Sequence, residues 1–119
     1  MLTQQKTSDR QELFTVLTDD NFRKEVIESR GSVLVEVGAD WCGTCHIIAP
    51  VLEKLAITYK GQIKFAKVDI EATEHVAREY GVTELPVLLF FKRGQIVDHL
   101  IGAAPKKIIV QKLNALLKE

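Results

Sequence analysis

Short apolar runs alternate with segments of helical periodicity along most of this chain. Residues 33–37 and 87–91 are almost wholly apolar, which is typical of strands covered on both faces of a sheet. Between them, apolar residues recur every three or four positions up to Lys60, as on one face of a helix. Because parallel strands need helical crossovers, the alternation predicts an α/β fold with helices on both faces of the sheet.

The complete pattern predicts five strands and four helices in the order β-α-β-α-β-α-β-β-α. The expected strands are residues 13–17, 33–37, 63–70, 87–91 and 96–101. A turn at residues 92–94 makes the last two strands a hairpin, which adds an antiparallel edge to the sheet.

Capping residues and apolar stripes define the expected helices. Thr18 precedes the first helix as a cap, and Pro105 suits the first turn of the last one. Pro50 falls inside the helix that ends near Lys60, where it removes a backbone donor and predicts a kink. The expected buried faces consist of Phe22, Val26 and Ile27 in the first helix and Ile109, Leu113, Leu116 and Leu117 in the last.

The size and charge of the chain restrict its class. Its 119 residues suffice for one domain with a hydrophobic core, which we place at residues 11–119 after a flexible polar tail at residues 1–10. Basic and acidic residues number 16 each, so no net charge favours nucleic acid or an anionic membrane as a partner. No apolar run is long enough to span a bilayer, and residues 1–10 lack the apolar stretch of an export signal. We therefore expect a monomeric, cytoplasmic protein.

The only two cysteines, Cys42 and Cys45, are spaced as Cys-x-x-Cys in the run WCGTCH. They lie where the strand at residues 33–37 gives way to a helix, so the free amides and the helix dipole stabilise a thiolate at Cys42. Cys45 follows one turn later and can attack a mixed disulfide formed at Cys42. Gly43 leaves room beside Cys42 for a substrate backbone. The motif predicts thiol–disulfide exchange, with Cys42 as the attacking thiol and Cys45 as the resolving thiol.

Three other uses of the cysteine pair can be weighed from the residues. Two buried core cysteines would need no Trp41 beside them at a strand–helix junction. A zinc site needs four ligands, and His46, His75 and His99 lack ligand spacing, so we expect no metal. The run CGTCH also matches the attachment motif of c-type haem, with His46 as axial ligand, although the α/β pattern and the lack of a second ligand weigh against it. In thiol chemistry His46 would instead tune Cys42.

Two charged residues interrupt strands that are expected to be buried. Glu36 shares a strand face with Leu34, and Lys67 shares one with Phe65 on the neighbouring strand. They are either solvated at the ends of the sheet or a partly buried pair beneath the helix that carries the cysteines. In the second case Glu36 accepts the proton of Cys45 when that thiol attacks. Burial would raise the pKa of Glu36, and Lys67 would lower it.

Seven segments of the chain together resemble the thioredoxin family, over about residues 13–117. They are VLVE at 33–36, ADWCGTC at 39–45, IAPVL at 48–52, AKVD at 66–69, YGV at 80–82, LPVLLF at 85–90 and GA at 102–103. The resemblance implies the thioredoxin fold, a mixed five-stranded sheet of strand order 1-3-2-4-5 flanked by four helices. It also implies a protein-disulfide reductase that binds no cofactor and is returned to the dithiol state by a flavin-based reductase of the thioredoxin-reductase type.

The resemblance implies roles for individual residues. Cys42, Cys45, Glu36 and Lys67 match the family's nucleophile, resolving thiol, buried acid and lysine partner. Pro86, which the sequence alone leaves either cis or trans, would be cis. Substrate proteins would dock on an apolar surface of Trp41, Gly43, Leu85, Pro86, Gly102 and Ala103. There the backbone of Leu85 would pair with an extended segment of the substrate.

The chain departs from the family at three positions of the site. Thr44 replaces proline and restores a backbone amide near the Cys42 sulfur, so we expect a better stabilised thiolate and a more oxidising couple. Glu36 replaces aspartate and is one methylene longer. Gly38 replaces a common aromatic residue and leaves Trp41 as the single tryptophan. Two alternative functions stay open: a redox-independent subunit that binds partners through the same surface, and the haem-bearing electron carrier.

Overall fold

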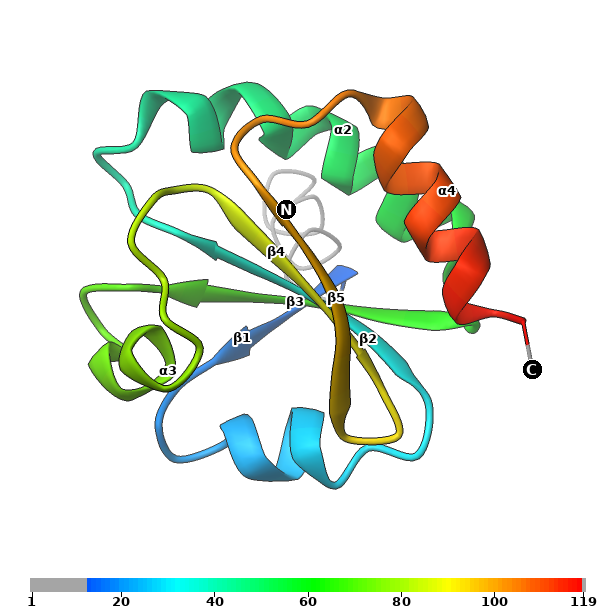
Figure 1. Ribbon diagram of the computed structural model, residues 1–119, viewed down its shortest axis with the longest axis horizontal. Coiled ribbons are helices and arrows are strands. Elements are labelled where there is room, and N and C mark those ends of the chain that lie inside the picture. Colours follow the sequence, from blue (N-terminus) through cyan, green and yellow to red (C-terminus); the bar gives the residue numbers. More distant parts are fainter. Residues whose placement is uncertain (1–12, 119) are drawn as a thin grey trace, which may run out of the picture.

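The computed structural model describes residues 13–118, and it has a central sheet with helices on both faces (Figure 1). Its elements are β1 (Phe14–Leu17), η1 (Arg23–Ile27), β2 (Ser32–Gly38), α2 (Gly43–Thr58), β3 (Ile63–Asp69), α3 (Glu74–Glu79), β4 (Val87–Lys92), β5 (Gln95–Ile101) and α4 (Lys106–Leu116). This confirms the predicted order of strands and helices. The expected tail at residues 1–10 lies outside the described residues.

The five strands lie in the order β1-β3-β2-β4-β5. Strands β1, β3 and β2 run parallel, whereas β4 is antiparallel to β2, and β5 is antiparallel to β4. This is the mixed sheet that the family resemblance implies. It places β2 in the middle of the sheet, where its side chains are covered from both faces.

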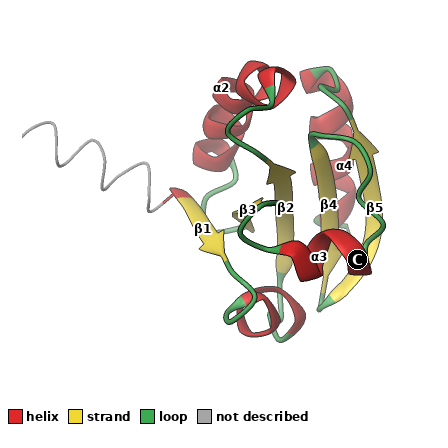
Figure 2. Cartoon of the chain, turned by 90° about the vertical axis from the view of Figure 1, so that its left-hand side faces the viewer, coloured by secondary structure: helices red, strands yellow, loops and turns green. Residues whose placement is uncertain are grey.

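Two apolar layers hold the helices against the sheet. Helices α2 and α4 cover one face, where Leu34, Phe65 and Phe90 are among the buried residues. Helices η1 and α3 cover the other face, over Val35 and Phe91 (Figures 1 and 2). Each buried aliphatic or aromatic side chain contributes about 1.5–3 kcal/mol, so these layers provide most of the stabilising free energy. Among residues 13–118, no helix has the length and apolar character needed to cross a bilayer.

Two residues that we expected on buried helix faces are exposed. Ile27 is 38% exposed, because the first helix is a π-helix of five residues that ends at this residue. Leu117 is 40% exposed, because α4 ends at Leu116 and the next residue points away from the buried stripe. Pro50 does lie inside α2, as predicted.

A two-residue turn joins β4 and β5. Its residues Arg93 and Gly94 both have positive φ, 52° and 79°, as in the mirror-image turns whose twist suits a hairpin. A side chain on Gly94 would overlap the carbonyl oxygen of Ile27 at the end of η1. The turn therefore needs glycine for two reasons, its backbone conformation and its close approach to another segment.

The variant Gly94→Ala is expected to lower the free energy of unfolding by roughly 3 kcal/mol or more, because backbone strain and steric overlap add together. Gly61→Ala is the matched control. Gly61 also has positive φ, at 86°, but a Cβ there would meet no atom of residues 13–118 within 4 Å, apart from its two chain neighbours. It should therefore lose only about 1 kcal/mol. Denaturant unfolding of both variants measures the difference, and equal losses would contradict the proposed overlap.

Candidate functional site

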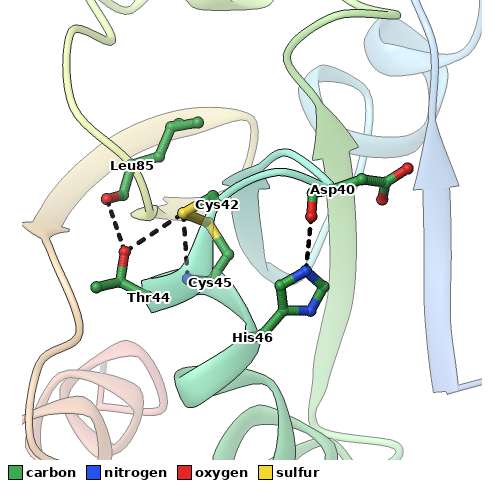
Figure 3. Close-up of a disulfide and its surroundings, with 6 residues drawn as sticks. All are labelled: Asp40, Cys42, Thr44, Cys45, His46 and Leu85. Atoms are coloured by element: carbon green, nitrogen blue, oxygen red, sulfur yellow. Dashed lines mark hydrogen bonds between the residues drawn. A yellow bond between two sulfur atoms is a disulfide. The ribbon is translucent and has the colours of Figure 1, made fainter.

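The cysteine pair lies where the central strand passes into a helix. Cys42 is the N-cap of α2, and its Sγ accepts a hydrogen bond from the backbone N–H of Cys45 at 3.2 Å. Cys42 and Cys45 form a disulfide, with their Cα atoms 5.3 Å apart, and both residues are buried (Figure 3). The sulfur of Cys42 thus occupies the position where the free amides and the positive dipole end of the helix favour negative charge.

Thr44 contacts Cys42 through its side chain. Its hydroxyl oxygen lies 3.3 Å from Cys42 Sγ and donates to the carbonyl oxygen of Leu85, also at 3.3 Å (Figure 3). We expected Thr44 to restore a backbone amide near this sulfur; the Thr44 group in contact with the sulfur is the hydroxyl. The amide that donates belongs to Cys45, because an N-cap side chain accepts from the second or third helical residue, and here it is the third.

Glu36 and Lys67 lie opposite each other in the parallel register of β2 and β3. Glu36 is partly buried beneath α2, as we expected for the pair, but the side chain of Lys67 is exposed. The Lys67 Nζ lies 5.7 Å from the centre of the Phe14 ring on β1, a cation–π contact. The prediction of partial burial is therefore correct for Glu36 and wrong for Lys67.

A cavity of about 300 Å³ opens beside Cys45. Among the residues that line it are Glu36, Gly38, Cys45, His46 and Lys67. A Cβ on Gly38 would lie 3.3 Å from Cys45 Sγ and 3.9 Å from Glu36 Oε2. Because Gly38 has no side chain, the Glu36 carboxylate and the Cys45 sulfur both border the same open space.

Burial raises the pKa of the Glu36 carboxyl above its usual range. The charges of Lys67 and His46 act in the opposite direction and lower it, but less than burial raises it. His46 is exposed, and its Nε2 lies 2.7 Å from the carbonyl oxygen of Asp40, so this nitrogen donates a proton to that bond. The ring is thereby fixed beside the cavity.

The residues expected to form the docking surface differ in exposure. Pro86 is buried and adds no apolar area there, contrary to our expectation; Leu85 and Gly102 are half-buried, and Trp41, Gly43 and Ala103 are exposed. Trp41 is 67% exposed, and its indole N–H donates to Glu71 Oε1 at 2.6 Å. The bond between Leu85 and Pro86 is cis, as the resemblance implied. The N–H of Gly102 donates to the carbonyl oxygen of Pro86 at 2.8 Å, which brings residues 102–103 to the same edge.

Two residues at this surface were missed by the sequence analysis. Glu71 holds the Trp41 indole, and no feature of the sequence pairs these two positions. Ile101 is 55% exposed at the end of β5, next to Gly102, and is an exposed apolar residue beside the expected docking residues. An apolar residue that ends an edge strand beside a predicted docking residue could have been a signal for this position.

Comparison with known proteins agrees with this geometry. The family model described as Thioredoxin matches residues 13–115. "Thioredoxin" from Chlorobaculum thiosulfatiphilum is 39% identical over 97 residues, which cover 82% of this chain and 90% of the relative. "Thioredoxin 1" from Nostoc sp. is 43% identical over 98 residues, or 82% and 92% of the two chains. "Thioredoxin M-type, chloroplastic" from Chlamydomonas reinhardtii is 42% identical over 101 residues, or 85% and 72%.

Replacing Glu36 by glutamine should stabilise the protein in a pH-dependent manner. Because burial raises the pKa of Glu36 in the folded state, its ionisation costs more there than in the unfolded chain. Below the unfolded pKa both states are protonated and this cost is absent. It grows as the pH rises and is complete above the folded pKa. Glu36→Gln is therefore expected to raise the free energy of unfolding at about pH 8 and to give no gain at about pH 3.

Denaturant unfolding at both pH values measures this effect. The matched control is Glu84→Gln, which removes an exposed carboxylate and should change stability little at either pH. A gain of equal size for Glu36→Gln at both pH values would contradict an electrostatic origin.

Proposed function

Because the chain belongs to the thioredoxin family, it is a thiol–disulfide oxidoreductase, and we propose that it reduces protein disulfides through Cys42 and Cys45. One observation supports this assignment of the two cysteines above all others. The Cys42 sulfur accepts a hydrogen bond from the Cys45 amide at 3.2 Å, and the Thr44 hydroxyl oxygen lies 3.3 Å from the same sulfur. Hydrogen bonds to the charged form favour a thiolate, and the thiolate is the attacking species. Family membership favours this activity over the binding subunit and the haem carrier that the residues left open.

The proposed reaction has two exchange steps. The Cys42 thiolate attacks one sulfur of the substrate disulfide, forms a mixed disulfide with it and releases the other sulfur as a thiolate. Cys45 then loses its proton and attacks Cys42 Sγ. This forms the disulfide between Cys42 and Cys45 and releases the second substrate sulfur. Two electrons pass from the dithiol to the substrate, and solvent protons complete the product thiols.

Glu36 is proposed to accept the Cys45 proton. A carboxyl whose pKa is raised by burial is a stronger base when ionised. No side chain at Gly38 separates the Glu36 carboxylate from the Cys45 sulfur. A water in the cavity of about 300 Å³ can relay the proton. Lys67 and His46 are proposed to moderate this carboxyl through their charges, since both lower its pKa.

Substrates are proposed to dock on the apolar surface around Cys42 and to pair with the backbone of Leu85. The family implies disulfide-containing substrates and a reductase partner. We propose that this partner is a flavin-based reductase and that the protein works as a monomer in the cytoplasm. A reducing compartment suits a dithiol that must be restored after each cycle.

Two serine variants should separate the roles of the cysteines. With insulin as a disulfide substrate, Cys45→Ser should accumulate the mixed disulfide, because no resolving thiol is present. Cys42→Ser should form none, although it retains one thiol. Gel electrophoresis without reductant detects the adduct. An adduct on Cys45 in place of Cys42 would reverse the assignment.

Rapid mixing extends the same experiment to Glu36. Glu36→Gln should form the mixed disulfide at nearly the normal rate but resolve it more slowly, because only the second step uses the carboxylate. Equal slowing of both steps would argue against proton transfer by this residue.

The reduction potential tests the direction of transfer. A value for the wild type below the cytosolic glutathione poise of roughly −220 to −260 mV supports a reductase, and a value above it contradicts one. Thr44→Pro removes the hydroxyl near Cys42 Sγ and should make the couple about 30 mV more reducing. Thr44→Ser retains the donor and should leave the potential unchanged. Equilibration in thiol buffers with Trp41 fluorescence as reporter measures all three proteins.

A further inference from the structure

The hydroxyl of Thr44 lies between two acceptors that belong to different parts of the site. Its oxygen is 3.3 Å from Cys42 Sγ and 3.3 Å from the carbonyl oxygen of Leu85 (Figure 3). A hydroxyl has a single proton to donate, so it can make only one of these hydrogen bonds at full strength. Thr44 therefore connects the attacking sulfur to the backbone that precedes β4.

The oxidation state of Cys42 determines which acceptor is the stronger. In the disulfide, Cys42 Sγ is neutral and accepts weakly, whereas a backbone carbonyl accepts well, so the proton goes to Leu85. In the dithiol state, the Cys42 thiolate carries a full charge. A charge-assisted hydrogen bond is roughly twice as strong as a neutral one, so the proton turns to the sulfur and leaves the Leu85 carbonyl free.

The carbonyl oxygen of Leu85 is the group that an extended substrate would use. Within residues 13–118, its hydrogen-bond partner is the Thr44 hydroxyl, and no backbone N–H donates to it. An added peptide strand would donate one of its own N–H groups to this oxygen. The Thr44 hydroxyl and the peptide therefore compete in the oxidised protein and do not compete in the reduced one.

We propose that Thr44 couples the oxidation state of Cys42 to peptide binding at Leu85. The reduced protein holds the chain whose disulfide it attacks, and formation of the disulfide between Cys42 and Cys45 helps to release that chain. This inference rests on the proposed function, since it assumes that substrates pair with Leu85. By linkage, a bound peptide must favour the reduced state by the same factor.

The test measures peptide affinity without turnover. The probe is a ten-residue peptide cut from the insulin B chain around a cysteine, with that cysteine changed to alanine so that no exchange occurs. Calorimetry gives its dissociation constant for the reduced and the oxidised protein. The wild type should bind the peptide about fivefold more tightly when reduced, the effect of one net hydrogen bond.

Thr44→Val keeps the shape of the side chain and removes the hydroxyl. Its two affinities should be equal, because the oxidised form now binds as well as the reduced one. Thr44→Ser retains the hydroxyl and should keep the fivefold ratio. Thr44 is exposed, so neither variant disturbs the core. A purely structural role would change both oxidation states alike and leave the ratio unaltered.

The outcomes distinguish the coupling through Thr44 from the reductase activity on which it rests. A fivefold ratio that persists in Thr44→Val, or a ratio near one in the wild type, would overturn the coupling and leave the reductase activity standing. Failure of the peptide to bind either form would overturn docking at Leu85 and the coupling with it. Loss of insulin reduction in the wild type, measured separately by turnover, would overturn the proposed function.

Discussion

The structure depends on the junction at which strand β2 ends and helix α2 begins. Strand β2 occupies the middle of the sheet, so its end is fixed by neighbours on both sides and by helices on both faces. A helix that starts there must satisfy its first amides, and it does so in part with the sulfur of Cys42. The capping group of the helix is therefore also one sulfur of the redox-active cysteine pair. Its geometry needs no separate scaffold, because the packing that holds the sheet together also fixes the sulfur.

The same junction explains why a carboxylate is tolerated beneath the helix. Glu36 lies one strand position away from the buried Val37, and an ionised group at this depth opposes folding. The cavity left by Gly38 lets its oxygens remain in contact with the space around Cys45. The protein thus retains a destabilising charge at the place where we propose a proton acceptor. Such conflicts between stability and local chemistry are typical of functional sites.

Much of this architecture follows from the sequence, since the periods of the apolar residues identify the strands and helices. The order of strands in the sheet came only with the family resemblance, because periodicity does not say which strands are neighbours. The prediction of burial was wrong at Ile27 and Leu117, which lie at helix ends, because a periodic pattern does not show at which residue the helix stops. In the site, the Cys-x-x-Cys spacing identified the cysteine pair. It did not predict that Thr44 would contact the Cys42 sulfur through its hydroxyl group. The contact of Lys67 with Phe14 likewise could not be expected, because Phe14 lies far away in the sequence.

The approach of Gly94 to the end of η1 has a consequence for the order in which the domain can be completed. Helix η1 is made early during synthesis, whereas the turn between β4 and β5 is made late. Until that turn has emerged, the carbonyl end of η1 lacks the segment against which it is packed in the finished molecule. The layer formed by η1 and α3 therefore reaches its final form only after the β4–β5 hairpin has paired with β2. One of the last turns of the chain packs against the end of its first helix, so the N-terminal part of the domain reaches its final packing together with the C-terminal part.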